Sequence, residues 1–105
     1  MANWQYHNPV AVHFGAGVLN TLPALLRGRK ASIVTFPEAR GFGLLSRLEK
    51  LAGDSLIGVI DQTQPNPDVD GLDALYRAFW REHRESEVIV AVGGGSALDT
   101  AKALM

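Results

Sequence analysis

Residues 88–102 read VIVAVGGGSALDTAK and decide the fold. Five apolar residues, Val88–Val92, lead into three glycines, Gly93–Gly95, and then into Ser96–Lys102, which we interpret as the start of a helix. Glycines have no Cβ, so the turn can adopt unusual backbone angles and its amides can approach an anion closely. The helix start presents unpaired N–H groups and the positive end of its dipole. The stretch therefore predicts a phosphate or pyrophosphate site at the carboxyl end of a parallel strand.

A purely structural turn is the alternative for the same residues. A strand–glycine–helix connection can serve tight packing alone, and Ser96 with Asp99 has the spacing of a helix-capping box. The spacing is neither the dinucleotide fingerprint G-x-G-x-x-G nor a P-loop, because no Gly-Lys-Ser/Thr follows. The flexible glycine turn and the unpaired N–H groups of the helix start favour phosphate binding over a purely structural turn. The motif would then belong to neither of those two classes.

Outward from this stretch, apolar runs alternate with segments of helical spacing. Ala31–Phe36 and Leu56–Ile60 are β-branched and nearly continuous, as expected for strands buried on both faces of a parallel sheet. Leucines at three- and four-residue steps predict helices within 19–26 and 44–51. A further helix has Asn66 as its cap, Pro67 at its first position, and a core-facing stripe. That stripe consists of Val69, Leu72, Leu75, Tyr76 and Phe79.

The order of elements predicts an α/β fold. Val10, Val12 and Phe14 alternate with Ala11 and His13, which indicates one more, half-exposed strand before the first helix. Strands and helices then alternate along the whole chain. We therefore expect a three-layer, Rossmann-like open parallel sheet with flanking helices and right-handed crossovers.

Composition excludes several classes of function. The chain has 105 residues, 47% of them hydrophobic, a formal net charge of −1 and no cysteine. Without cysteine, disulfides and thiolate metal sites are excluded. The charges are mixed in sign and contain no basic run, so no positively charged surface for nucleic acid or an anionic membrane is expected. No signal peptide or membrane-length apolar stretch is present, so we expect a cytoplasmic protein without nucleic-acid or membrane partners.

The glycine motif also resembles a known signature. Gly93-Gly94-Gly95-Ser96-x-x-Asp99-x-Ala101-Lys102 is similar to the glycine-rich motif of iron-containing alcohol dehydrogenases. The resemblance extends over nearly the whole chain, because other family elements occur in the right order. They are an FGxG turn at Phe14–Gly17, an LP pair at Leu22–Pro23, the strand end Val34–Thr35, and the PNP element Pro65–Pro67.

The resemblance implies a site for NAD or NADP. In that family the N-terminal domain binds the cofactor, so the Gly93–Ser96 loop would hold its pyrophosphate through the backbone of Gly94, Gly95 and Ser96. Asp99 and Lys102 line the same region in the family. A carboxylate in the first helical turn repels phosphate, however, so a role of Asp99 as capping partner for Ser96 stays open.

The chain departs from the family after its second strand. The family commonly has Thr-Asp where this chain has Thr35-Phe36, and that aspartate would accept hydrogen bonds from the adenosine ribose and repel a 2′-phosphate. The resemblance thus places Thr35 and Phe36 at the cofactor, but Phe36 neither accepts hydrogen bonds from the ribose nor repels a 2′-phosphate. Arg40 is near enough in sequence to be a 2′-phosphate partner, so the choice between NAD and NADP stays open. This variant, together with the opening residues 4–9, resembles the branch associated with phosphonate metabolism, whose substrate is phosphonoacetaldehyde.

The family's metal, Fe²⁺ or Zn²⁺, is held in a mostly helical C-terminal domain by an aspartate and three histidines. His7, His13 and His83 lack ligand spacing, so we expect ordinary surface histidines and neither catalytic nor metal-binding residues. The chain stops within an expected helix at Met105. We therefore expect residues 1–105 to be the N-terminal part of the NAD(P)-binding domain, inactive alone, with the metal domain and the rest of the sheet absent.

The parent enzyme would transfer a hydride between NAD(P) and an alcohol or aldehyde, with the metal polarising the substrate oxygen. An exposed final strand or helix face could also drive homodimer formation or strand exchange between copies. Two alternatives stay open. One is a related enzyme of the glycerol dehydrogenase or dehydroquinate synthase type, and the other is a non-enzymatic phosphate- or nucleotide-binding module.

Overall fold

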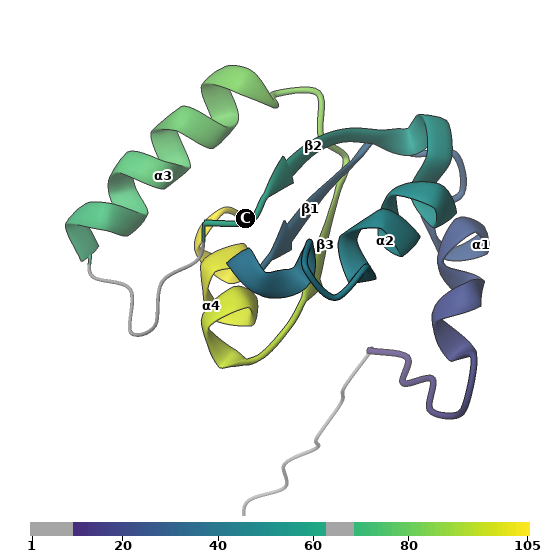
Figure 1. Cartoon of the computed structure of the whole chain (residues 1–105). Helices are drawn as coiled ribbons and strands as arrows, with labels where there is room; N and C mark the ends of the chain where they lie inside the picture. The colour runs from purple at the N-terminus through teal and green to yellow at the C-terminus, as the bar shows by residue number, and fades with distance from the viewer. Residues whose placement is uncertain (1–9, 63–68) are drawn as a thin grey trace, which may run out of the picture.

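A parallel sheet forms the centre of the molecule. The computed structural model describes residues 10–62 and 69–105. Its strands are β1 (Ala31–Thr35), β2 (Leu56–Ile60) and β3 (Val88–Val92), in the order β2-β1-β3 and all parallel (Figure 1). The three apolar runs predicted as buried strands are thus confirmed, with Phe36 just beyond the end of β1.

Helices cover both faces of this sheet. The α-helices are α1 (Leu22–Leu26), α2 (Leu44–Ala52), α3 (Val69–Glu82) and α4 (Gly95–Ala103), and short 3₁₀ turns span Val18–Thr21, Pro37–Ala39 and Gly53–Ser55. In Figure 1, α1 and α2 lie on one side of the strands and α3 and α4 on the other. The predicted three-layer α/β arrangement is confirmed.

The core is divided by the central strand. Successive side chains of a strand point to opposite faces, so Ile33 packs with the leucines of α1 and α2 whereas Val34 packs with Phe79 of α3 and Leu104 after α4. All five residues of β1 are buried, while those of β2 and β3 are half-buried. The prediction of strands buried on both faces therefore holds fully for β1, which has a neighbour on each side.

The predicted first strand is wrong. Residues 10–14 form no strand, and Val10, Val12 and Phe14 are 67%, 82% and 100% exposed. Alternating side chains give a segment β propensity, but a strand also needs a neighbour that pairs with its backbone. Here the segment lies beyond α1, away from the sheet (Figure 1), and no described strand runs beside it.

The stripe of α3 is buried only near its C-terminal end. Phe79 is 1% exposed and Leu75 and Trp80 pack around it, but Val69 and Tyr76 are 82% and 42% exposed. Because the first half of the helix extends away from the sheet (Figure 1), the prediction that Val69 and Tyr76 face the core is wrong. The predicted cap and first residue of this helix, Asn66 and Pro67, lie outside the described residues.

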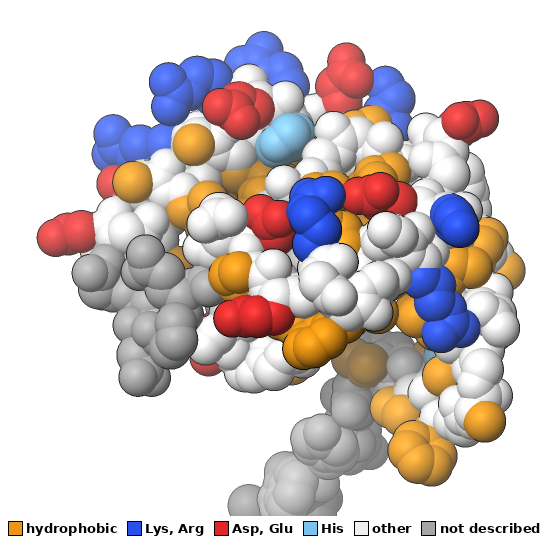
Figure 2. Space-filling view, in the orientation of Figure 1, with side chains coloured by type: hydrophobic (Ala, Val, Ile, Leu, Met, Phe, Trp, Pro, Cys, Tyr) orange, Lys and Arg blue, Asp and Glu red, His pale blue; other side chains and the backbone are white. Residues whose placement is uncertain are grey.

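Charged side chains are spread over the surface. Acidic and basic groups are interspersed on the face shown in Figure 2. No helix within the described ranges has the length and apolar character needed to cross a bilayer.

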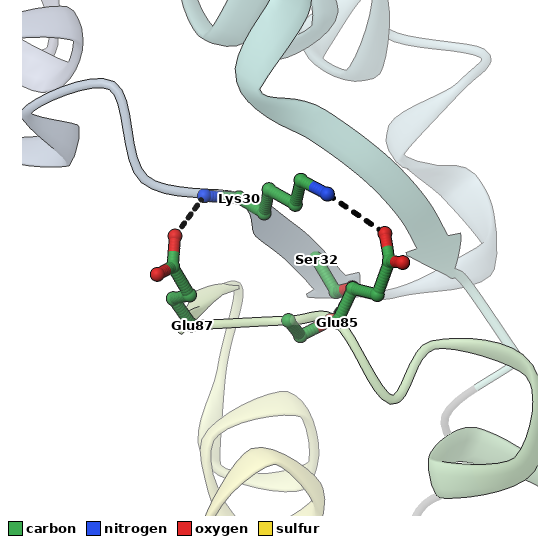
Figure 3. A network of polar contacts seen from close by, with 5 residues as sticks. Lys30, Ser32, Glu85 and Glu87 are labelled. Atoms are coloured by element: carbon green, nitrogen blue, oxygen red, sulfur yellow. Dashed lines mark hydrogen bonds and ion pairs between the residues drawn. The ribbon is translucent and has the colours of Figure 1, made fainter.

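A polar network joins the start of β1 to the residues before β3 (Figure 3). The backbone N–H of Lys30 donates to Glu87 Oε2 at 2.9 Å, and Lys30 Nζ donates to Glu85 Oε2 at 2.8 Å. Beside them, the hydroxyls of Ser32 and Ser86 share a hydrogen bond of 2.6 Å. These contacts bridge more than 50 residues of chain and fix where β3 enters the sheet.

The ion pair in this network predicts a pH dependence of stability. The hydrogen bond with Lys30 lowers the pKa of Glu85 from 4.5, and the same bond raises the pKa of Lys30 from 10.5. The ion pair therefore stabilises the folded chain fully at pH values between 4.5 and 10.5, the ordinary pKa values of the two groups. It is lost as pH falls through the lowered pKa of Glu85 or rises through the raised pKa of Lys30.

Glu85→Gln should accordingly lower the urea midpoint slightly at neutral pH, because the pair is exposed and screened. The difference from the native chain should shrink below pH 4.5 and in high salt. Urea titrations at several pH values measure it. A difference that widens as pH falls would contradict the assignment of the ion pair.

Candidate functional site

The glycine turn after β3 is packed tightly against the end of β1. Gly93 has a φ of +143°, a region that side-chain-bearing residues rarely adopt. A Cβ at this position would lie 3.0 Å from Phe36 Cδ1 and 3.1 Å from the Cβ of Ala97. Gly93 is thus required by the packing of the turn, and it holds the start of α4 against Phe36.

The N-terminus of α4 has backbone donors without helical partners. Gly94 is the N-cap and makes no side-chain capping bond, and the first helical bond runs from Leu98 N–H to the Gly94 carbonyl at 3.2 Å. The amides of Gly95, Ser96 and Ala97 therefore have no acceptor within the helix. Together with the helix dipole they form a local site for negative charge.

The predicted capping box at Ser96 is wrong. The helix begins at Gly95, so Ser96 already lies in its first turn, and Asp99 is exposed further along. The carbonyl of Ser96 accepts a hydrogen bond from Thr100 Oγ1 at 2.7 Å. The glycines allow the helix to start before the serine without any side-chain cap.

A pocket of about 300 Å³ lies between this helix end and the segment after β1. On one side it is lined by Gly94, Gly95, Ser96 and Ala97, and on the other by residues 36–38. The two sides meet because Thr35 of β1 pairs with Val92 of β3, so the residues that follow these strands leave the sheet next to each other. Its volume is at the lower end of the range for small-molecule sites, roughly 300–1,000 Å³.

The lining contains a single charged side chain, that of Glu38. Its carboxylate forms no hydrogen bond or ion pair with any residue in 10–62 or 69–105. The nearby cation, Arg40, pairs instead with Asp61 after β2, with 3.4 Å between Nη2 and Oδ2. The pocket thus combines a row of amide donors on one side with an unpaired carboxylate on the other.

The structure brings together part of the predicted site. Gly94, Gly95, Ser96 and Phe36 line the pocket, with Gly93 packed against Phe36. Thr35 is fully buried, and its hydroxyl donates a hydrogen bond to the Val92 carbonyl at 2.8 Å. It therefore links β1 to β3 and does not line the pocket.

Two further predicted residues, Asp99 and Lys102, are exposed on α4 and also lie outside the lining. Cofactor-binding roles for Thr35, Asp99 and Lys102 stay predictions.

Sequence reasoning missed three lining residues, Pro37, Glu38 and Ala97. The available signal was an acidic residue a few positions after the strand next to the glycine turn, where dinucleotide-binding folds place a carboxylate. Glu38 lies two residues after Phe36, which occupies the position of the aspartate in the family's Thr-Asp pair, so the family pattern does not mark Glu38.

The described residues do not fit a metal centre. No group of three or more His, Asp or Glu side chains comes together within residues 10–62 and 69–105. His83 packs against Phe79, with ring centroids 5.5 Å apart, and covers Gly58 of β2, where a Cβ would lie 2.6 Å from its ring. His13 lies in another shallow pocket, beside Val18 and Leu22, and His7 lies outside the described residues.

The sequence is similar to oxidoreductases of known family. It is 34% identical over 104 residues to alcohol dehydrogenase 4 of Saccharomyces cerevisiae. It is 32% identical over 102 residues to maleylacetate reductase 1 of Cupriavidus pinatubonensis. Each match covers 94% of this chain and 27% of the relative, so the chain spans about a quarter of their length.

Solved structures give the same relationship. The fold matches sulfoacetaldehyde reductase from Bifidobacterium kashiwanohense, solved in complex with NAD⁺, with a TM-score of 0.84 and 30% identity. That match covers 98% of this chain and 28% of the reductase. Residues 9–105 match the family described as iron-containing alcohol dehydrogenase. The chain therefore belongs to the iron-containing alcohol dehydrogenase family.

Proposed function

We propose that the Gly93–Ser96 loop binds the pyrophosphate of NAD or NADP. The observation that carries this proposal is the pocket between β1 and α4, whose lining includes the residues with unpartnered helix-start amides. A pyrophosphate needs several converging N–H donors and a positive local potential, and a helix N-terminus supplies both. The NAD⁺ complex of the similar sulfoacetaldehyde reductase supports the choice of a dinucleotide over a free phosphate.

The open space beside Gly94 and Gly95 supports the same assignment. Gly94 and Gly95 have no atoms within 4 Å of the position where a Cβ would be, so their missing side chains leave open space. Glycine there lets a phosphate approach the backbone closely, which a purely structural turn does not require. This open space favours binding over the structural alternative at the same residues.

We further propose that residues 1–105 are the N-terminal part of the cofactor-binding domain of an oxidoreductase. The bound nicotinamide supplies the hydride acceptor or donor for interconversion of an alcohol and an aldehyde. The chain's own contribution is to hold the pyrophosphate on Gly94, Gly95 and Ser96 and to fix the orientation of the cofactor. No group of three or more His, Asp or Glu side chains lies together within residues 10–62 and 69–105. From the family resemblance we place the metal ligands of the parent enzyme in its C-terminal domain.

For the substrate we propose a small aldehyde with an anionic group on the neighbouring carbon, phosphonoacetaldehyde in particular. Thr35-Phe36-Pro37 in place of Thr-Asp supports this branch of the family. Sulfoacetaldehyde, the substrate named for the similar Bifidobacterium enzyme, has the same carbon skeleton with a sulfonate in place of the phosphonate. We place this reaction in the cytoplasm and propose a homodimer, formed through the apolar side chains exposed at residues 10–14.

Calorimetric titration of the chain with NAD⁺ tests the binding step. We expect saturable binding that weakens with increasing salt and is competed by inorganic pyrophosphate. Saturable binding without competition by pyrophosphate would contradict the loop as the site, and absence of binding would contradict the proposed function.

The catalytic part is tested by following NADH oxidation. The 105-residue chain should bind NADH without oxidising it when phosphonoacetaldehyde is added. A longer protein that includes the family's metal ligands should turn the aldehyde over. Turnover by the 105 residues alone would contradict the proposed division of the enzyme.

A further inference from the structure

The pocket carries an unpaired carboxylate whose role the family motif does not explain. Glu38 lines the pocket opposite the amide row of α4, and it is the one charged group in the lining. It lies in the short 3₁₀ turn Pro37–Ala39, which follows β1 directly and begins with the fixed backbone of Pro37. Because Ala39 at the end of this turn is fully buried, the turn is anchored to the core and Glu38 is held at the pocket.

The position of Glu38 relative to the sheet indicates which part of a dinucleotide it would meet. In open α/β folds the pyrophosphate lies at the glycine turn, and the adenosine ribose meets an acidic residue after a neighbouring strand. Here the glycine turn follows β3, and β1 is the strand that pairs with β3. A dinucleotide with its pyrophosphate on Gly94–Ser96 therefore places its ribose against residues 36–38.

The residue in the usual acidic position cannot take part in this contact. Phe36 has no hydrogen-bonding group in its side chain, and its ring is packed against Gly93. On this side of the pocket, a ribose would therefore find its side-chain acceptor in Glu38, two residues further on. The carboxylate has no competing partner among the described residues, so both of its oxygens are available to the ribose hydroxyls.

The nearby cation does not offset this negative charge. Arg40 would be the natural partner for a 2′-phosphate, but its guanidinium pairs with Asp61, which is less exposed than Arg40 itself. A 2′-phosphate would thus meet the unpaired carboxylate of Glu38, and it would compete with Asp61 for the guanidinium of Arg40. Like charges brought together in a binding site weaken binding, and solvent screens part of this repulsion because Glu38 is exposed.

We propose that Glu38 is the residue that selects NAD over NADP, by accepting hydrogen bonds from the adenosine ribose and repelling a 2′-phosphate. The inference rests on the proposed binding of the pyrophosphate at Gly94–Ser96. Glu38 would thus take the function that an aspartate at the position of Phe36 has in the family, and we expect the chain to prefer NAD.

The test compares the dissociation constants of NAD⁺ and NADP⁺ for the chain and its variants. The native chain should bind NAD⁺ about tenfold more tightly than NADP⁺, from charge-assisted hydrogen bonds on one side and repulsion on the other. Glu38→Gln should reduce this preference to about twofold or less, by weakening NAD⁺ and strengthening NADP⁺. Glu38→Arg should reverse it.

Glu49→Gln is the matched control, because it removes the same charge from α2, outside the pocket lining. It should leave the ratio of the two constants unchanged, and circular dichroism should show all the variants folded, since Glu38 is exposed.

An unchanged ratio in Glu38→Gln, or a native preference for NADP⁺, would overturn the assignment of Glu38 while leaving the dinucleotide site in place. Binding of neither cofactor would overturn both.

Discussion

Replacing Gly95 with aspartate should abolish dinucleotide binding and leave the fold at least as stable as before. Gly95 is the first residue of α4 and lines the pocket, with no atom within 4 Å of the place that a Cβ would occupy. An aspartate there fills the space of the pyrophosphate and adds a like charge, which costs several kcal/mol and corresponds to a loss of affinity of about 100-fold or more. The same carboxylate is favourable for the helix, because it lies at the positive end of the dipole.

The opposite signs of these two effects separate a binding site from a structural turn. Calorimetry with NAD⁺ measures the first, and the urea midpoint measures the second. Ser46→Asp, which adds the same charge to the first turn of α2 on its exposed side, is the control. It should favour its helix in the same way and leave the affinity for NAD⁺ unchanged, because it lies outside the pocket lining. If Gly95→Asp kept its affinity for NAD⁺, the pyrophosphate could not lie on the helix start.

Replacing Phe79 with alanine should remove most of the stability of the chain. Phe79 is 1% exposed and joins three elements, since it packs against Val34 of β1 and against Ala101 and Leu104 at the end of α4. Burial of a phenylalanine in a close-packed core makes its truncation cost about 3–5 kcal/mol, a large part of the total stability of a small domain. The denaturant midpoint measures this loss.

Tyr76→Ala is the matched control on the same helix. Tyr76 is one turn earlier than Phe79 and 42% exposed, so its truncation should cost much less, about 1 kcal/mol or below. Equal losses for the two variants would contradict the observation that α3 contacts the sheet only near its C-terminal end.

The parallel sheet could be predicted from sequence because its signal is local. β1, β2 and β3 lie in short apolar runs rich in β-branched residues, and polar residues, glycine or proline bound these runs. Burial on both faces leaves that composition whatever the partner strand is. The segment 10–14 shows the limit of the same reasoning. Its alternation is as regular as that of a strand, but pairing depends on a neighbour that the segment's own residues do not specify.

The candidate site was predicted more fully on the α4 side than on the β1 side, where the family resemblance marked Phe36 but neither Pro37 nor Glu38. Three consecutive glycines between a strand and a helix indicate a close approach to the backbone, so the α4 side of the pocket follows from the sequence. The other side depends on which strand pairs with β3, and only the strand order β2-β1-β3 shows that residues 36–38 face the glycines. The place of Glu38 at the pocket and the ion pair between Arg40 and Asp61 become visible only with this tertiary placement.

The start of α4 could not be placed to the residue for a related reason. Ser96 and Asp99 match a capping pattern, but the glycines before them allow the helix to begin one residue before the serine. The pocket is therefore lined by Gly95 and Ser96 as the first two residues of the helix, and the Ser96 hydroxyl does not cap the helix. Local patterns give the type of an element more reliably than its end.

The central claim is that a dinucleotide binds where β1 and β3 end, and NMR mapping of the backbone amides tests it most directly. On titration with NAD⁺, we expect the largest chemical-shift changes at Gly94, Gly95, Ser96 and Ala97, with a second group at residues 36–38. Saturable shifts confined to another surface, such as the pocket beside His13 and Leu22, would contradict it, as would amides of the glycine loop that do not move.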